Sequence, residues 1–200
     1  MRLLLYGFVL LVLTGLVQAA RPAPPQLICL VPFAGIPSAQ VQAVKQAVAD
    51  FYHLPVAVLP TEQLPESAIC PVRHRYRAYV ILDQLAAQFP ATPAARTKLL
   101  ALTTADIEHE APPKKPHWGI FGLANTVGGN ECIASTFRLG ATRTDRFIKV
   151  SLHEVGHTLH LPHCTSGSAV CLMNDGKGKV ATVDAEEIFL CDACHAKMLW

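Results

Sequence analysis

The chain has 200 residues, of which 51% are hydrophobic and 16% are charged, enough apolar material for one folded domain of ordinary size. Its 17 Lys and Arg against 15 Asp and Glu give a net charge of +2, and no block of like charge occurs. These numbers argue against a disordered chain and against nucleic-acid binding as the main activity. The unusual counts are seven cysteines and nine histidines, most of which lie in the last quarter of the chain.

The N-terminus has the layout of a secretory signal. Arg2 precedes an apolar run over residues 3–17, and the small residues around Ala19 suit cleavage. The run is short for a membrane-spanning helix, which needs about 20 apolar residues, and an uncleaved anchor is the alternative. The sequence therefore predicts a signal peptide over residues 1–19, a Pro-rich linker over 20–26 and a single domain over 27–200. We expect the mature chain to be exported (periplasmic or secreted), soluble without a membrane anchor, and monomeric.

The first half of this domain is predicted to alternate strands and helices. Apolar runs at 27–32 and 55–60 predict two buried strands. Between them a helix begins at Ser38, a suitable N-cap, and its apolar face consists of Val41, Val44, Val48 and Phe51. A second helix is predicted over 75–89 and a third strand over 99–107. Strand, helix and strand in this order are typical of an α/β layer.

The second half is predicted to contain a hairpin and two more helices. Residues 108–118 include Pro112, Pro113 and Pro116 and are interpreted as a loop. Strands at 119–127 and 131–139 flank a Gly-Gly-Asn turn, and a helix follows over 142–161. After a polar loop at 165–179, a last helix is expected to start near Asp184, with Glu187 three residues further on as in a capping box.

The most informative segment is His153-Glu154-Val155-Gly156-His157. On a helix this pattern places two imidazoles one turn apart on one face, close enough to bind one metal ion. His163 can supply a third ligand if the helix ends after Leu159 and the chain turns sharply. Three histidines leave the fourth position of Zn²⁺ open for water, as in catalytic sites. Glu154 is then the predicted general base, which takes a proton from that water and delivers it to the leaving amine. The alternative is a helix with ordinary core or surface histidines.

A second group consists of four cysteines. Cys164 and Cys171 form one pair, and Cys191 and Cys194 form a CxxC pair further on. Two pairs at such a separation predict a closed structural zinc site with four thiolates. Because an exported protein permits disulfides, disulfide bonds remain an alternative, and a redox-active CxxC is another.

The other cysteines and histidines show no spacing that indicates a site. Cys29, Cys70 and Cys132 are interpreted as buried thiols or as one disulfide, with Cys29 and Cys70 as the candidate pair. The histidines interpreted as ordinary surface or core residues are His53, His74, His109, His117 and His195.

Together these motifs resemble the archaemetzincin family of zinc metalloproteases, whose signature is HExxHxxGxxHC, four residues, CxM, seventeen residues and CxxC. The matching residues here are His153, Glu154, His157, His163, Cys164, Cys171, Met173, Cys191 and Cys194. Segments at 73–76, 102–107, 118–124 and 135–139 are also similar to the family, so the resemblance covers most of the mature chain.

The resemblance implies an α/β (α+β) fold: a metzincin-like mixed sheet with an active-site helix and a C-terminal zinc-bound helical segment. It implies two zinc ions per chain, one catalytic and one structural, and peptide or protein substrates. Met173 would lie beneath the catalytic zinc without binding it. The strand around residues 131–138 would form the edge of the sheet, where a peptide substrate could add as an extra strand.

The chain departs from the family signature at two places. His160 stands where the family has glycine, so we expect a histidine with positive φ after the helix, or a competitor of His163 for the metal. Six residues rather than four separate Cys164 from Cys171, and a loop around Gly167 is expected to absorb the two extra residues.

The sequence thus predicts an exported zinc peptidase. The alternative from another class is a non-catalytic, zinc-stabilised binding module that keeps both metal sites but lacks a productive cleft. A third hypothesis, thiol–disulfide exchange, requires Cys191 and Cys194 to be free and reactive.

Overall fold

The computed structural model describes residues 27–89, 96–111 and 115–198. The predicted signal peptide and linker therefore lie outside the described residues. Within the described ranges, no helix combines the length and the apolar character that a membrane span requires.

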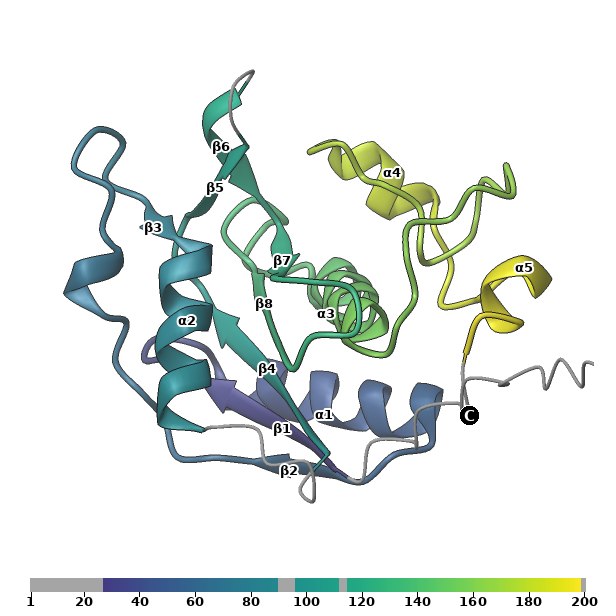
Figure 1. Ribbon diagram of the computed structural model, residues 1–200, viewed down its shortest axis with the longest axis horizontal. Helices are drawn as coiled ribbons and strands as arrows, with labels where there is room; N and C mark the ends of the chain where they lie inside the picture. The colour runs from purple at the N-terminus through teal and green to yellow at the C-terminus, as the bar shows by residue number, and fades with distance from the viewer. Residues whose placement is uncertain (1–26, 90–95, 112–114, 199–200) are drawn as a thin grey trace, which may run out of the picture.

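A five-stranded mixed sheet forms the centre of the fold, with the strand order β2-β1-β4-β8-β7 (Figure 1). Four strands are parallel, and β7 runs antiparallel to β8 at the edge. Their bounds are β1 Leu27–Pro32, β2 Val56–Val58, β4 Thr97–Thr103, β7 Gly122–Ala124 and β8 Glu131–Ser135. The predicted fold class is thus confirmed, but the prediction of the edge strand is wrong: β8 lies inside the sheet, and β7 covers it.

Helices cover both faces of this sheet. α1 (Ser38–Tyr52) and α3 (Thr144–Thr158) pack on one face, and α2 (Ala78–Gln88) packs on the other (Figure 1). Alternate residues of each strand serve the two layers, since Ile28 and Leu30 of β1 face α1 while Cys29 and Val31 face α2. Both faces of the central strands are buried, as expected for a parallel sheet covered by helices.

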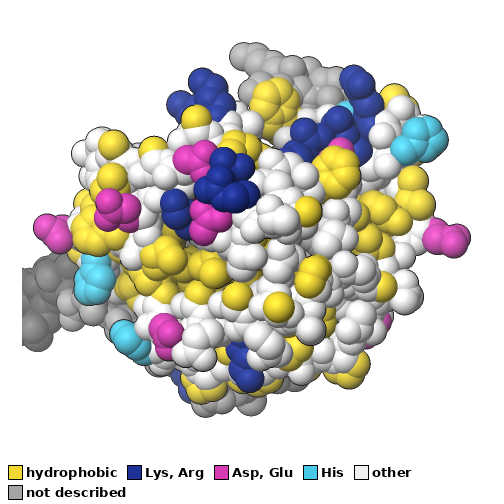
Figure 2. Space-filling view, turned by 180° about the vertical axis from the view of Figure 1, so that it is seen from behind, with side chains coloured by type: hydrophobic (Ala, Val, Ile, Leu, Met, Phe, Trp, Pro, Cys, Tyr) yellow, Lys and Arg dark blue, Asp and Glu magenta, His cyan; other side chains and the backbone are white. Residues whose placement is uncertain are grey.

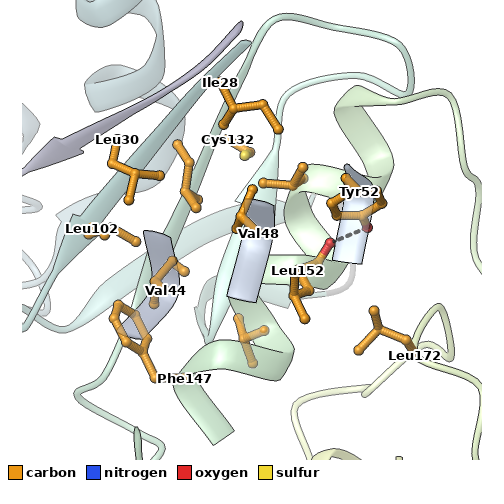
Figure 3. Packing of buried hydrophobic residues seen from close by; sticks show 14 of the residues in the cluster. Ile28, Leu30, Val44, Val48, Tyr52, Leu102, Cys132, Phe147, Leu152 and Leu172 are labelled. Atoms are coloured by element: carbon orange, nitrogen blue, oxygen red, sulfur yellow. Dashed lines mark hydrogen bonds between the residues drawn. The ribbon is translucent and has the colours of Figure 1, made fainter. Parts of the chain in front are cut away.

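The layer between the sheet, α1 and α3 supports the helix that carries the metal-binding motif. Figure 3 shows Val44 and Val48 of α1 beside Phe147 and Leu152 of α3. The buried Tyr52 hydroxyl donates a hydrogen bond of 2.7 Å to the carbonyl of Leu152, the residue before His153 (Figure 3). The core therefore fixes α3 against α1 directly beside the first histidine of the motif.

A second, three-stranded sheet overturns the predicted loop at 108–118. Strands β3 (Tyr76–Arg77), β5 (Ile107–Ala111) and β6 (Lys115–Ile120) pair in the order β3-β5-β6. Proline is tolerated in β6 because this strand lies at an edge. Pro112 and Pro113 lie outside the described residues. β3 also shortens the predicted helix at 75–89, because the amide of Tyr76 donates to the carbonyl of Asp106 and starts the strand pairing.

The C-terminal part differs from the predicted capping box. Two short helices, α4 (Val180–Ala185) and α5 (Asp192–His195), replace one helix starting near Asp184. Asp184 lies inside α4, and its carboxylate binds the guanidinium of Arg146 on α3 at 2.6 and 2.7 Å. Figure 2 shows basic and acidic side chains side by side on the face turned away from the view of Figure 1. Asp184 thus tethers the C-terminal segment to α3 and does not cap a helix.

Candidate metal centre and substrate cleft

The active-site helix ends as the three-histidine arrangement requires. The amide of His160 donates to the carbonyl of His157, and that of Leu161 donates to the carbonyl of Gly156. This is the Schellman pattern, in which the residue after the C-cap takes a left-handed conformation. His160 occupies that place with φ 71°, so the expected positive φ is confirmed for a residue that is usually glycine. The sharp turn brings His163 back toward α3.

The three histidines predicted as zinc ligands come together. The candidate ligand atoms of His153, His157 and His163 lie within 4.8 Å of one another, and the ring centres are 4.6 to 5.3 Å apart. His160 is not part of this group. Its ring lies over Gly128, where a methyl group would be 2.4 Å from it. His160 thus packs on the 126–129 loop.

Two of the imidazoles have a defined tautomer. Nδ1 of His153 lies 2.7 Å from the carbonyl of Leu172, and Nδ1 of His157 lies 2.7 Å from the carbonyl of Leu161. A carbonyl only accepts, so each Nδ1 carries the hydrogen and each Nε2 keeps a free lone pair. Burial lowers the pKa of His153 to about 3 and also lowers that of His157, with the neighbouring imidazoles adding to both effects. Neutral imidazoles fixed in this way suit a metal ion.

Glu154 is buried beside this cluster and is held by β7. Burial raises its pKa to about 8, while a hydrogen bond from the backbone amide of Ala124 opposes the rise. The backbone of Gly122 approaches the same side chain so closely that a methyl group there would lie 2.6 Å from Cγ and Oε1 of Glu154. Strand β7 therefore sets the position of the carboxylate. No sequence pattern indicated this role of Gly122 and Ala124, although both lie in the family-like segment at 118–124.

Cavities flank the cluster on two sides. One, of about 460 Å³, is lined by Trp118 and Ile120 of β6, by His153, Glu154 and His163, and by residues 174–178. The other, of about 540 Å³, runs along residues 122–127 past His157 and Pro162. Gly122, Glu154 and His163 line both. An extended chain could therefore lie across the cluster beside β7.

The four predicted cysteine ligands also come together. Their sulfur atoms lie within 4.8 Å of one another, and Cys164 Sγ is 3.7 Å from Cys191 Sγ. A tetrahedral zinc site with Zn–S bonds of 2.3 Å has S–S distances of about 3.8 Å. All seven cysteines are free thiols, so the structure contains neither a disulfide in this cluster nor the candidate bond between Cys29 and Cys70. Cys29, Cys70 and Cys132 are all buried, as expected.

The six-residue connection between Cys164 and Cys171 contributes to this cluster. The hydroxyl of Ser166 lies 3.1 Å from Cys164 Sγ and 3.2 Å from Cys191 Sγ. Hydrogen bonding from Ser166 is the main reason that the pKa of Cys191 falls to about 6, which favours the thiolate that a metal requires. Gly167 in the same connection has φ 80° and open space around it.

The thiol cluster and the histidine cluster are joined through short connections. Cys164 directly follows His163, and its amide donates to the carbonyl of Met173 at 2.7 Å. The fully buried Met173 lies against α3 at Gly156, between the two histidines of the helix. The C-terminal segment thus supports both the third histidine and the base of the histidine cluster.

Helix α3 presents HExxH on a mixed sheet, beside the antiparallel edge strand β7, and the turn after the helix supplies a third histidine. This combination defines a metallopeptidase site. Comparison with known proteins identifies the family. Residues 38–199 match the model of peptidase family M54. The chain therefore belongs to this family of zinc metallopeptidases.

Relatives and solved structures agree with this assignment. The chain is 29% identical over 180 residues to the archaemetzincin of Halobacterium salinarum, covering 83% of this chain and 95% of the relative. It is 30% identical over 182 residues to that of Haloarcula marismortui, covering 82% and 97%. The crystal structure of archaemetzincin from Archaeoglobus fulgidus, complexed with malonate, matches with a TM-score of 0.71 at 26% identity, covering 86% of this chain and 99% of that one. The structure from Methanopyrus kandleri gives 0.70 at 28% identity, covering 86% and 92%.

Proposed function

We propose that the chain hydrolyses peptide bonds with a zinc ion held by Nε2 of His153, Nε2 of His157 and the imidazole of His163, and with Glu154 as the general base. The observation that carries the proposal is the convergence of three candidate ligand atoms within 4.8 Å, beside a buried carboxylate and between two cavities. Zinc at such a site lowers the pKa of a water ligand to about 7 and polarises the peptide carbonyl.

The residues of the chain perform the proton transfers and the positioning. The carbonyls of Leu172 and Leu161 hold the Nδ1 hydrogens of two histidines and so orient their rings. Glu154 accepts the proton of the attacking water and passes it to the leaving amine. A carboxyl whose pKa lies near neutrality can do both, and a nearby cation favours the carboxylate form that starts the cycle.

We place the substrate along β7. This strand is the outermost strand of the large sheet in the part of the chain that the structure describes, and the second cavity follows residues 122–127. A peptide chain added there would pair with β7 and pass over Glu154 and the histidines. Trp118 and Ile120 would then contact its side chains from the opposite wall of the first cavity.

A second zinc ion, held by Cys164, Cys171, Cys191 and Cys194, is part of the proposal. A closed four-thiolate site has no open position, so it stabilises the fold without taking part in the reaction. Replacing Cys191 and Cys194 with Ser together should lower the zinc content by one ion per chain. Mild chelation of the parent should remove the histidine-bound ion first and leave a folded protein. An unchanged zinc content in the double variant would contradict the second site.

Export also belongs to the proposal, and it rests on the N-terminal sequence alone. Removal of residues 1–19 as a signal peptide predicts a mature N-terminus at Ala20. N-terminal sequencing of the protein from its native host tests this directly. An intact Met1 on protein recovered from the cytoplasm would contradict export.

The experiment that tests the proposed activity is cleavage of a mixed peptide library by the zinc-loaded chain. We expect cleavage that stops on chelation and returns with added Zn²⁺. Absence of cleavage across a broad library by a folded, zinc-loaded protein would contradict the peptidase proposal and favour a zinc-stabilised binding module.

A further inference from the structure

A third group of metal-ligating side chains lies outside both clusters described above. Cys70, Glu108 and His117 offer ligand atoms that all lie within 4.8 Å of one another. Cys70 Sγ is 3.3 Å from Nδ1 of His117, and Glu108 Oε1 is 3.0 Å from the same nitrogen. His117, for which the sequence showed no partner spacing, thus contacts both other members of this cluster through one ring nitrogen.

Three separate segments build this group, which is why no short sequence motif reveals it. Cys70 begins a tight turn in which its amide donates to the carbonyl of Arg75. Glu108 lies on β5, and His117 lies on β6 where the register shifts between His109 and Ala111. His117 has φ 57°, and its carbonyl accepts a hydrogen bond from Nη1 of Arg75. A β-bulge commonly changes the direction in which a side chain points. Here the irregularity in the pairing includes His117, whose imidazole faces the cluster.

The buried carboxylate points to a cation. The side chain of Glu108 is 0% exposed, and among the described residues its Oε2 has no hydrogen-bond partner. A buried carboxylate with an unsatisfied oxygen is costly unless a positive charge compensates it. The ion-pair partner of Glu108 is His117, whose Nδ1 lies within hydrogen-bond distance of the carboxylate. The same imidazole also faces the thiol of Cys70.

The geometry argues against a catalytic Cys-His-Glu relay. Such a relay uses both ring nitrogens, with the carboxylate on one and the nucleophile on the other. Here sulfur and carboxylate both face Nδ1. Three donors around one point are instead the arrangement of a metal site, and tetrahedral zinc places S and N, or N and O, roughly 3.3 to 3.6 Å apart. The observed distances lie within a few tenths of an ångström of this range.

We propose that Cys70, Glu108 and His117 bind a third zinc ion. Thiolate and imidazole ligands favour Zn²⁺ over Mg²⁺ or Ca²⁺, which prefer sites made only of oxygen. The His117 side chain is 22% exposed, so water can reach the fourth position. The ion joins the Cys70 turn to β5 and β6.

Zinc at this place stabilises one wall of the substrate cleft. Trp118 directly follows His117, lines the first cavity and contacts Gly178 across it, where a methyl group would lie 3.0 Å from the indole. A metal that fixes His117 in its left-handed conformation therefore also fixes the point from which Trp118 projects. The site has a structural effect on the cleft and is separate from the histidines proposed to act in catalysis.

The test is the zinc content of the full chain and of two matched variants after gel filtration in zinc-free buffer. His117→Asn removes the imidazole but keeps a residue that tolerates positive φ. His74→Asn is the control, because His74 also has positive φ (52°), is exposed and lies outside the cluster. We expect His117→Asn to hold one zinc ion fewer per chain than the parent, and His74→Asn to hold the parental number.

Cys70→Ser provides the second arm of the experiment. It should lose the same single ion, and the double variant with His117→Asn should also lose one ion and not two. Circular dichroism of each variant confirms that the loss does not follow from unfolding. Equal zinc content in the parent and folded His117→Asn would overturn the proposal, as would loss of two ions in the folded double variant. Because each result is a difference from the parent, it does not depend on whether the proposed catalytic zinc is present.

Discussion

Gly122 on the edge strand and Glu154 on the active-site helix are in such close contact that no side chain fits between them. A methyl group at Gly122 would lie 2.6 Å from Glu154 Oε1 and 2.8 Å from the carbonyl of Ile133. The carbonyl belongs to a central strand and cannot retreat, so the carboxylate would have to move. The edge strand thus serves both as the proposed substrate platform and as the support of the proposed general base.

Gly122→Ala should therefore lower kcat while the zinc content stays unchanged. Displacement of a catalytic group by about 1 Å can cost on the order of 100-fold in rate. Peptide cleavage and elemental analysis of the variant measure the two quantities. In a Glu154→Gln background the same change should add little, because the group that it displaces is already inactive. Additive losses in the double variant would show that Gly122 acts by another route.

Gly156→Ala should destabilise the fold from beneath the histidine cluster. The added methyl would lie 2.7 Å from Met173 Sδ and 2.9 Å from the Tyr52 hydroxyl, which is hydrogen-bonded to Leu152. Overpacking costs about 1–3 kcal/mol and outweighs the gain of about 1 kcal/mol in helix propensity. Urea unfolding measures the difference. Gly176→Ala, with open space around it, is the control and should leave stability unchanged. Equal stability of both variants would contradict the close packing of Met173.

His160 allows the strain of its left-handed conformation to be measured. His160→Gly and His160→Ala both remove the imidazole, but only glycine adopts φ 71° without cost. The glycine variant should be more stable than the alanine variant by on the order of 1 kcal/mol, and both should keep the histidine-bound zinc. Loss of that zinc from the glycine variant would mean that His160 is a ligand and that His163 is assigned wrongly.

Glu186 should make stability depend on pH. Burial raises its pKa in the folded chain to about 7, from an ordinary value of 4.5. Between these values the folded state holds the proton and the unfolded state does not, so stability falls as pH rises. Relative to Glu186→Gln, the parent should lose on the order of 1 kcal/mol of unfolding free energy between about pH 5 and pH 8. This loss is smaller than the pKa shift alone implies, because solvent screens a partly accessible carboxylate. Parallel stability curves for the two proteins would show that Glu186 is not buried in solution.

The active-site segment could be predicted from the sequence because its chemistry is local. HExxH fixes two ligands one turn apart, and the need to return His163 predicts the end of α3. The positive φ of His160 was implied by the glycine that the family signature has at this position. The four cysteines were likewise found from their spacing. The bounds of the C-terminal helices could not be predicted, because Asp184 binds Arg146 of α3 and does not cap a helix.

The sheet edge and the small sheet depended on contacts between distant segments. Prolines at 108–118 indicated a loop, yet the segment pairs as β5 and β6, with Pro116 on an edge strand. The family resemblance implied that the strand around residues 131–138 forms the edge, although the predicted hairpin of 119–127 and 131–139 already paired it with the segment that forms β7. The group of Cys70, Glu108 and His117 could not be predicted, because its members come from distant segments and lie up to 47 positions apart.

The most direct test of the central claim compares zinc-loaded parent and Glu154→Gln protein in a peptide-cleavage assay, with zinc measured in the same samples. Gln keeps the size and much of the hydrogen bonding of Glu but cannot accept the proton. We expect equal zinc content, an unchanged fold and cleavage slower by roughly two to four orders of magnitude. His157→Ala, in contrast, should lose the ion itself. Cleavage by Glu154→Gln at the parental rate would contradict the proposed mechanism.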